Sequence, residues 1–225
     1  MSNKIEISAA ETASAVADLD PSDEALAAMA IVGLYERKAL LWDANRGRAL
    51  IEATWLRRFR ALLPAGGTVL DLGCGAGAPI AGHLLAQGHP VTGVDTSATL
   101  LDIARDRFPQ GEWRRGDMRR LRLGRRFDGL IAWDSFFHLT PEDQRAMFPI
   151  FREHLAARGA LLFTSGPAHG TAMGSFGDEP LYHASLSPEE YRSLLAAEGF
   201  EVIAHTAEDP DCGGHTVWLA RLRQE

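Results

Sequence analysis

An apolar run that leads directly into three alternate glycines most constrains how this chain can fold. The run is VLDL at residues 69–72, and the glycines are Gly73, Gly75 and Gly77. Glycine permits positive φ and lets another group approach the backbone closely, so such a turn suits a binding loop at the end of a strand. The dinucleotide fingerprint would place its third glycine at position 78, where this chain has Ala78, so a nicotinamide or flavin site is the weaker interpretation.

Three further segments follow in an ordered series. Asp95 ends the apolar run 90–94, and a carboxylate some twenty residues past a glycine loop can accept both hydroxyls of a ribose. The alternative is that Asp95 caps the helix beginning near Ser97, although Ser97 is itself a good cap. Asp117 follows the strand-like segment 112–115, and the apolar run 127–132 leads into an aromatic turn at 133–139.

In this order and spacing, the four segments resemble the motifs of class I methyltransferases that depend on S-adenosylmethionine (SAM), of the small-molecule type. The resemblance covers residues 35–221. It implies that the glycine loop wraps the methionine part of SAM, that Asp95 binds the ribose and that Asp117 holds the adenine. The cofactor-binding residues that it implies are Asp71, Gly73, Cys74, Gly75, Gly77, Asp95, Thr96, Asp117, Met118, Trp133, Asp134, Tyr35, Trp42 and Arg46.

Tyr35, Trp42 and Arg46 belong to a helical segment similar to the one that covers the SAM pocket in many small-molecule members of the family. The match is approximate, because Glu36 follows the tyrosine here. Arg46 can pair with the SAM carboxylate through its forked guanidinium, or it can be an exposed arginine at a helix end.

Strand-like and helical segments alternate after residue 68, which predicts an α/β fold with a parallel sheet covered by helices on both faces. The last two strands are joined by too few residues for a helical crossover, so they should pair antiparallel. The resemblance implies a Rossmann-like sheet of seven strands in the order 3-2-1-4-5-7-6. We expect strands at 68–72, 90–94, 112–115, 127–132, 159–164, 200–206 and 216–222, and helices near 77–87, 97–107, 141–157 and 188–198.

The amino-terminal part should contain a mobile segment, residues 1–19, followed by helices at 25–42 and 48–63. We expect residues 20–225 to form a single methyltransferase domain with 20–63 as its helical cap. The segment 166–186 is rich in glycine and proline and is long for a connection within a compact domain, which predicts a loop or lid.

Composition limits the partners. The formal net charge is −7, which disfavours a nucleic-acid or anionic-membrane surface, and the arginines at 114–126 are expected on a solvated face. The two cysteines, Cys74 and Cys212, suggest neither a disulfide framework nor a zinc site. No segment is apolar over the length of a membrane span. We therefore expect a cytoplasmic monomer or homodimer.

Ligands bind at the carboxyl ends of parallel strands, so the acceptor should meet SAM at that edge. His138 or His183 is the candidate general base there, if the nucleophile arrives protonated. Phe137, Tyr182 and His215 are the candidate acceptor contacts, although Phe136, Phe137 and Phe176 are each more typical of a core. A divalent metal on His205, Asp209, Asp211 and His215 is a less favoured alternative, since their spacing matches no metal motif, and we expect no metal.

The sequence thus predicts a methyltransferase that moves a methyl group from SAM to an oxygen or nitrogen of a small molecule. The alternatives are a methyltransferase acting on a protein or RNA, a non-catalytic SAM-binding subunit and a nicotinamide oxidoreductase. The tetrad Asp134-Ser135-Phe136-Phe137 has some likeness to the D-P-P-Y motif of adenine-amino methyltransferases, but it lacks both prolines and the tyrosine.

Overall fold

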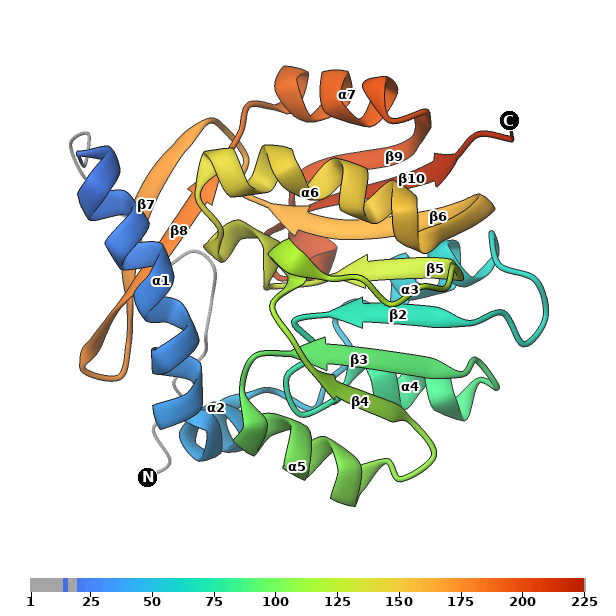
Figure 1. The fold of residues 1–225 in the computed structure, drawn as a ribbon, viewed down its shortest axis with the longest axis horizontal. Coiled ribbons are helices and arrows are strands. Elements are labelled where there is room, and N and C mark those ends of the chain that lie inside the picture. Colours follow the sequence, from blue (N-terminus) through green and yellow to red (C-terminus); the bar gives the residue numbers. More distant parts are fainter. Residues whose placement is uncertain (1–13, 16–19, 225) are drawn as a thin grey trace.

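A seven-stranded sheet organises the computed structural model, which describes residues 14–15 and 20–224. Its strand order is β4-β3-β2-β5-β6-β10-β9, which is 3-2-1-4-5-7-6 in chain order and confirms the predicted topology (Figure 1). β10 is antiparallel to both of its neighbours, and the other pairs are parallel. The strands are β2 (Val69–Leu72), β3 (Val91–Asp95), β4 (Glu112–Arg115), β5 (Phe127–Ala132), β6 (Leu155–Ser165), β9 (Phe200–Asp209) and β10 (His215–Leu222).

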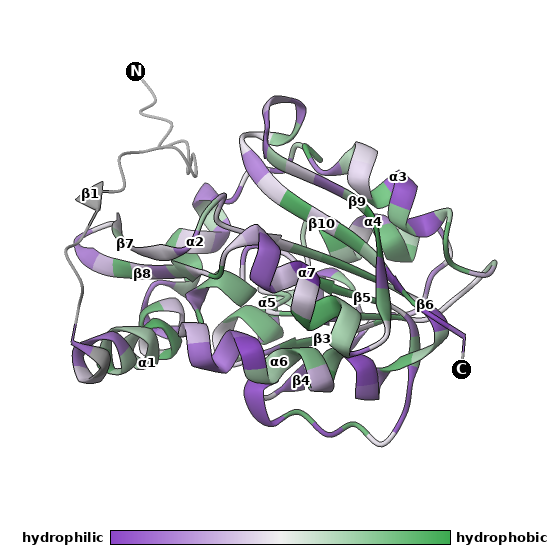
Figure 2. Cartoon of the chain, turned by 90° about the horizontal axis from the view of Figure 1, so that it is seen from above, coloured by the Kyte–Doolittle hydropathy of each residue, from purple (hydrophilic) through white to green (hydrophobic). Residues whose placement is uncertain are grey.

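Helices cover both faces of this sheet. Side chains of α3 (Ala53–Arg60), α4 (Ile80–Ala86) and α5 (Ala98–Arg107) pack on one face, and those of α6 (Pro141–His154) and α7 (Pro188–Ala197) pack on the other. Figure 2 shows that the strands between these layers are largely apolar. Three short 3₁₀ turns complete the connections: η1 (Met118–Arg120), η2 (Phe136–His138) and η3 (Pro210–Cys212).

The helices predicted near 141–157 and 188–198 both begin with a hydrogen-bonded cap. The Thr140 hydroxyl accepts the Asp143 N–H at 3.1 Å, and the Ser187 hydroxyl accepts the Glu190 N–H at 3.2 Å. In each case proline occupies the first turn, where its missing N–H costs nothing. The end of α6 differs from expectation: the helix stops at His154 because Leu155 already pairs with β5.

The segment 166–186 is a β-hairpin, so the prediction of a loop was wrong. Its strands are β7 (Gly170–Phe176) and β8 (Glu179–Ser185), joined by a two-residue turn in which Gly177 has φ 65°. Gly-Asp is a favoured hairpin turn, but the glycines of β7 weaken the alternating pattern that identifies a strand. Ala184 and other β8 side chains pack against apolar side chains of α1 (Pro21–Arg37). This packing on a distant helix stabilises the hairpin and is not visible in its local sequence.

The cap consists of α1 (Pro21–Arg37) and α2 (Ala39–Asn45), which lie beside the hairpin at one end of the sheet (Figure 1). The helical conformation is interrupted at Lys38, so the single helix predicted for 25–42 forms two helices. The helix predicted for 48–63 is the shorter α3. Most of the predicted mobile segment 1–19 lies outside the described residues. Its described part, β1 (Ser14–Ala15), pairs antiparallel with β7.

Aromatic rings fill the core between the sheet and α6–α7, with Phe136 at the centre. Its ring lies 5.5 Å from that of Phe163 and 5.6 Å from that of Phe151, centre to centre, and it has no exposed surface. Phe136 is therefore a core residue, as the sequence favoured, although it lies only two residues from Asp134 at the ligand-binding edge.

We predict that Phe136→Ala lowers the free energy of unfolding by about 3–5 kcal/mol, because it removes a fully buried ring and leaves a cavity. Urea denaturation followed by circular dichroism measures this change. The control is Leu40→Ala, since Leu40 is 71% exposed on α2. Equal stability of the two variants would contradict the assignment of Phe136 to the core.

Candidate active site

The carboxyl ends of β2, β3 and β5 lie side by side and face the cap and the hairpin (Figure 1). This is the edge at which open parallel sheets bind ligands. The glycine loop leaves β2, Asp95 ends β3, and Asp134 follows β5, so the topology brings these three predicted site elements together.

Asp95 is held by backbone N–H groups on both of its oxygens. Oδ2 accepts the Gly75 N–H at 2.8 Å, and Oδ1 accepts the Ser97 N–H at 2.9 Å. The cap of α5 is Ser97, whose hydroxyl accepts the Leu100 N–H, so Asp95 is not that cap. Each carboxylate oxygen can accept a second hydrogen bond, which leaves Asp95 able to receive two hydroxyls.

The three glycines of the loop have positive φ, and each lies close to a side chain from another element. A Cβ on Gly75 would come within 2.7 Å of the Trp42 ring, and one on Gly73 within 2.2 Å of the Ser135 Cβ. The close neighbours in this structure are protein side chains, so the approach of a ligand to this backbone stays a prediction. Trp42 lies against Gly75 as part of the cap.

Asp71, at the end of β2, is only 4% exposed. Burial, and secondly the charge of Asp95, raise its pKa to about 7. Burial also raises the pKa of Asp95, although its backbone hydrogen bonds act in the opposite direction. A buried carboxylate beside a half-buried one favours a ligand that brings hydroxyl groups and positive charge.

Glu36 joins the cap to the sheet domain, a role that the sequence analysis did not find. Its carboxylate accepts the hydroxyls of Ser97 at 2.5 Å and Thr99 at 2.9 Å, at the start of α5. A second connection is the bidentate ion pair of Asp43 with Arg107, at 2.8 and 2.9 Å. The departure from the family pattern at Glu36 thus has a structural use.

Arg46 is neither free nor exposed at a helix end. Its guanidinium pairs with Glu52 at 2.8 Å, and its side chain is 17% exposed. Glu52 is fully buried, and its Oε2 has no hydrogen-bond partner. The indole N–H of Trp133, at the end of β5, is buried and unpartnered as well. Buried polar atoms without partners are rare in folded proteins and suggest a place for a ligand or water.

Asp134 and His215 form an ion pair between the end of β5 and the start of β10. Nε2 of His215 is 3.0 Å from Oδ1 and hydrogen-bonds Oδ2 at 3.2 Å, and Nδ1 lies 2.6 Å from the Cys212 carbonyl. Burial alone would lower the pKa of His215, but Asp134 outweighs it and raises that pKa to about 9. Burial would likewise raise the pKa of Asp134, but His215 lowers it.

His138 is hydrogen-bonded through both ring nitrogens. Nδ1 lies 2.8 Å from the Tyr182 carbonyl and so donates to it, which leaves Nε2 to accept the Tyr35 hydroxyl at 2.9 Å. Burial, followed by the neighbouring His183, lowers the pKa of His138 to about 3. The lone pair of His138 is therefore occupied, which makes this residue a weaker candidate for a general base than the sequence suggested.

His183, on β8, is the better placed of the two histidines. Its ring lies 4.9 Å from that of His138 and 5.2 Å from that of Phe137, centre to centre. Burial lowers its pKa, and the charge of Asp134 acts in the opposite direction. His183 is therefore neutral at pH 7, as a proton acceptor must be.

Other predicted residues have supporting positions. Tyr182 is fully buried between the hairpin and α1, where its hydroxyl donates to Glu24, so the geometry does not support its side chain as an acceptor contact. Asp117 is ion-paired with Arg119, which also binds Asp143, and its role toward adenine stays a prediction. Cys74 is buried, and Thr96 lies partly exposed beside Asp95.

The residues of the alternative metal site point to different partners. His205 stacks on Trp218 with ring centres 3.6 Å apart, and Asp209 accepts the Trp55 indole N–H at 2.8 Å. Within residues 20–224, no three histidine, cysteine or acidic side chains are grouped as metal ligands.

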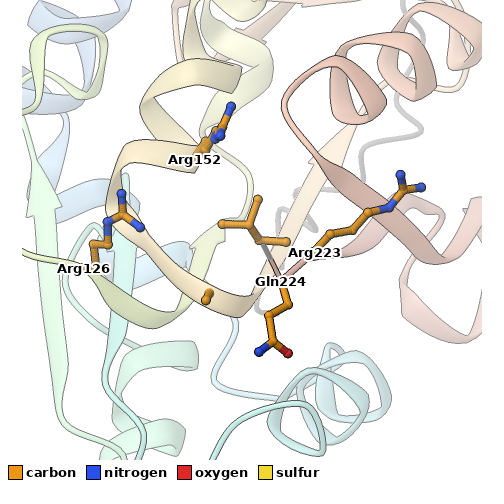
Figure 3. A pocket seen from close by; sticks show the side chains of 6 residues that line it. Arg126, Arg152, Arg223 and Gln224 are labelled. Atoms are coloured by element: carbon orange, nitrogen blue, oxygen red, sulfur yellow. The ribbon is translucent and has the colours of Figure 1, made fainter.

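A separate pocket lies at the opposite end of the strands. It is lined by Arg126, Arg152, Arg223 and Gln224 among others, near the amino ends of β5 and β6 (Figure 3). This position separates it from the glycine loop.

Among the described helices, none is both long and apolar enough to cross a bilayer.

Comparison with known proteins agrees with this geometry. Residues 69–159 match the family model described as a methyltransferase domain. The match begins at β2 and runs into β6, so it includes the glycine loop, Asp95 and Asp134.

Curated relatives include two methyltransferases with different acceptors. A dTDP-3-amino-3,4,6-trideoxy-alpha-D-glucopyranose N,N-dimethyltransferase of Streptomyces venezuelae is 32% identical over 46% of this chain and 44% of its own length. Magnesium-protoporphyrin O-methyltransferase of Rhodobacter capsulatus is 33% identical over 55% of each. The chain thus spans about half the length of these relatives.

Solved structures share the fold at lower identity. The SAM-bound amino pentose methyltransferase CalS10 from Micromonospora echinaspora has a TM-score of 0.64 and 22% identity, over 82% of this chain and 95% of its own. The sugar N-methyltransferase KedS8 from a Streptoalloteichus species has a TM-score of 0.68 and 20% identity, over 82% and 92%. These similarities confirm the Rossmann-like architecture.

We predict that the imidazole of His215 titrates near pH 9 in nuclear magnetic resonance spectra, and that Asp134→Asn lowers this pKa to about 6.5 or below. Since the folded-state pKa is raised, the pair stabilises the fold fully below about pH 6.5 and ceases to do so as the pH passes about 9. A wild-type His215 that titrates near 6.5 would contradict the ion pair.

Proposed function

We propose that this chain is a SAM-dependent methyltransferase that acts on a small molecule. The observation that carries the proposal is Asp95, a half-buried carboxylate at the end of β3 whose oxygens are aligned by the N–H groups of Gly75 and Ser97. The matched methyltransferase domain supports it, as do relatives that methylate small molecules.

The residues present fit SAM. Asp95 has free lone pairs for two ribose hydroxyls. Its charge contributes to the raised pKa of the neighbouring Asp71. Glu52 Oε2, Asp134 Oδ1 and the Trp133 indole N–H are buried without hydrogen-bond partners near the same edge. Two acceptors and one donor of this kind suit a ligand with both ammonium and carboxylate groups, and Arg46 lies beside them.

SAM supplies an electrophilic methyl group, which the lone pair of the acceptor takes as the carbon–sulfur bond breaks and its electrons stay on sulfur. The task of the protein is to align the two reactants and exclude water. Tyr35, Phe137 and the cap surround the site, and Tyr35 stacks on Phe176. His183 takes the proton from an acceptor that arrives protonated, because its imidazole is neutral at pH 7.

The acceptor atom is an oxygen or a nitrogen, as in the two curated relatives described above. A small acceptor is favoured over a protein or RNA because the chain is acidic, and arginines such as Arg119 and Arg125 are ion-paired with carboxylates. A cytoplasmic location and a monomeric or homodimeric state remain part of the proposal. Thermal shifts with SAM, S-adenosylhomocysteine (SAH), NAD and NADP distinguish a methyltransferase from an oxidoreductase.

We predict that Asp95→Ala weakens SAH binding about a hundredfold or more, because two charge-assisted hydrogen bonds of roughly 1.5–3 kcal/mol each are lost. Isothermal titration calorimetry gives the affinity, and thermal melting verifies that the variant is folded. The matched control is Asp102→Ala, which removes a carboxylate that is 73% exposed on α5. An unchanged affinity in folded Asp95→Ala would refute the ribose assignment.

We predict that His183→Gln lowers turnover about a hundredfold while SAH affinity changes little, since the base acts on the acceptor and not on the cofactor. Turnover is measured as transfer of labelled methyl from SAM to small molecules of a cell extract. His83→Gln on α4 is the control. If His183→Gln retains more than about a tenth of wild-type turnover, the site works by alignment alone.

A further inference from the structure

Large apolar side chains that stay exposed are concentrated in the cap. They are Leu26, Met29 and Val32 on α1 and Leu40 and Leu41 on α2, and elsewhere among residues 20–224 they are Ile51 and Ile203. Leu26 and Met29 are the most exposed on α1, at 64% and 62%. Single exposed apolar groups are ordinary, but groups that gather on one element mark a surface on which another surface docks.

α1 is apolar on two opposite sides. On its inner side, Ala28, Ile31 and Leu34 are buried against the hairpin. At 3.6 residues per turn, Leu26 and Met29 lie on the side of the helix opposite to Ile31. Figure 2 shows α1 at the rim of the molecule, so this outer side faces away from the sheet. A helix that is apolar on both sides is typical of an element covered on both.

The charges of α1 suit a second copy of the same helix in the antiparallel direction. Asp23 is exposed in the first turn and Arg37 in the last, about four turns apart, so both lie on the same side of the helix. A Cβ on Gly33 would come within 2.7 Å of Nη1 of Arg37, so the guanidinium folds back along the outer side. Arg37 also pairs with Glu179 of the hairpin, and its side chain remains 58% exposed. A two-fold axis near Met29, in the middle of α1, brings Asp23 of each copy to Arg37 of the other.

We propose that the outer side of α1 is a homodimer interface, at which the α1 helices of two copies pack antiparallel about a two-fold axis at Met29. Leu26 and Met29 are then shielded by the other copy, and two pairs of Asp23 with Arg37 flank them. An anionic membrane is disfavoured by the net charge of −7 and by the acidic first turn of α1. The inference is independent of the methyl-transfer reaction and selects the homodimer from the two states named above.

Sedimentation velocity of the full chain, from about 1 to 100 µM, tests the interface. Wild-type protein should dimerise with a Kd of about 10 µM or less. Met29→Glu places two carboxylates at the two-fold axis and should weaken dimerisation about a hundredfold or more. Ile203→Glu, the same kind of change at an exposed apolar residue of β9, should leave the Kd unchanged. Thermal melting followed by circular dichroism verifies that both variants are folded.

A charge exchange tests the antiparallel arrangement. Asp23→Arg and Arg37→Asp should each weaken self-association about tenfold, because like charges then face each other across the axis. An equimolar mixture of the two variants should form a heterodimer about as tight as the wild-type dimer, since opposite charges meet again at both ends of the helix pair. Only a second copy of this chain in that direction produces this result.

Three outcomes would overturn the inference. The first is a wild-type chain that stays monomeric at about 100 µM; if Met29→Glu then also lowers the melting temperature, the outer side is covered by another segment of the same chain. The second is a folded Met29→Glu variant that dimerises as tightly as Ile203→Glu. The third is a mixture of the two charge variants that associates no more tightly than either variant alone.

Discussion

The rest of the site depends on the hydrogen bonds that the backbone N–H groups of Gly75 and Ser97 donate to the Asp95 carboxylate. They connect the glycine loop after β2 to the end of β3 and the start of α5, three segments that the parallel sheet brings to one edge. Glu36 then fastens the cap to the same helix start, through the hydroxyls of Ser97 and Thr99. Because each contact shares a partner with the next, loop, sheet and cap form a single hydrogen-bonded unit.

The sheet could be predicted from sequence because its strands are short apolar runs with clear breaks between them. The strand order and the reversed last strand are both confirmed, the latter because a short turn cannot hold a crossover helix. The hairpin at 170–185 was missed for the opposite reason. Its first strand carries Gly174 and few apolar side chains, and it is held by pairing with β8 and by packing against α1, neither of which is visible locally.

The place of the candidate site was predictable where residues follow the end of a strand in a motif, as for Asp95 and the glycines, which the structure brings to one edge of the sheet. It was not predictable where partners meet across long separations in sequence. The pairing of Asp134 with His215 joins two strands, and the hydrogen bond of His138 with Tyr35 joins η2 to the cap. The hydrogen bond from Tyr35 occupies the Nε2 lone pair that His138 would need as a general base. No local sequence pattern predicts this contact, because the two residues are far apart in the chain.

The position of Asp71 beside Asp95 has a thermodynamic consequence. With a pKa of about 7, this buried carboxyl is close to half protonated in neutral solution. A positively charged molecule that settles at this edge favours the ionised form, so its association is coupled to release of a hydrogen ion into the solvent. The affinity of such a molecule then depends on pH, and it falls as the pH falls through the pKa of Asp71 without any change of shape.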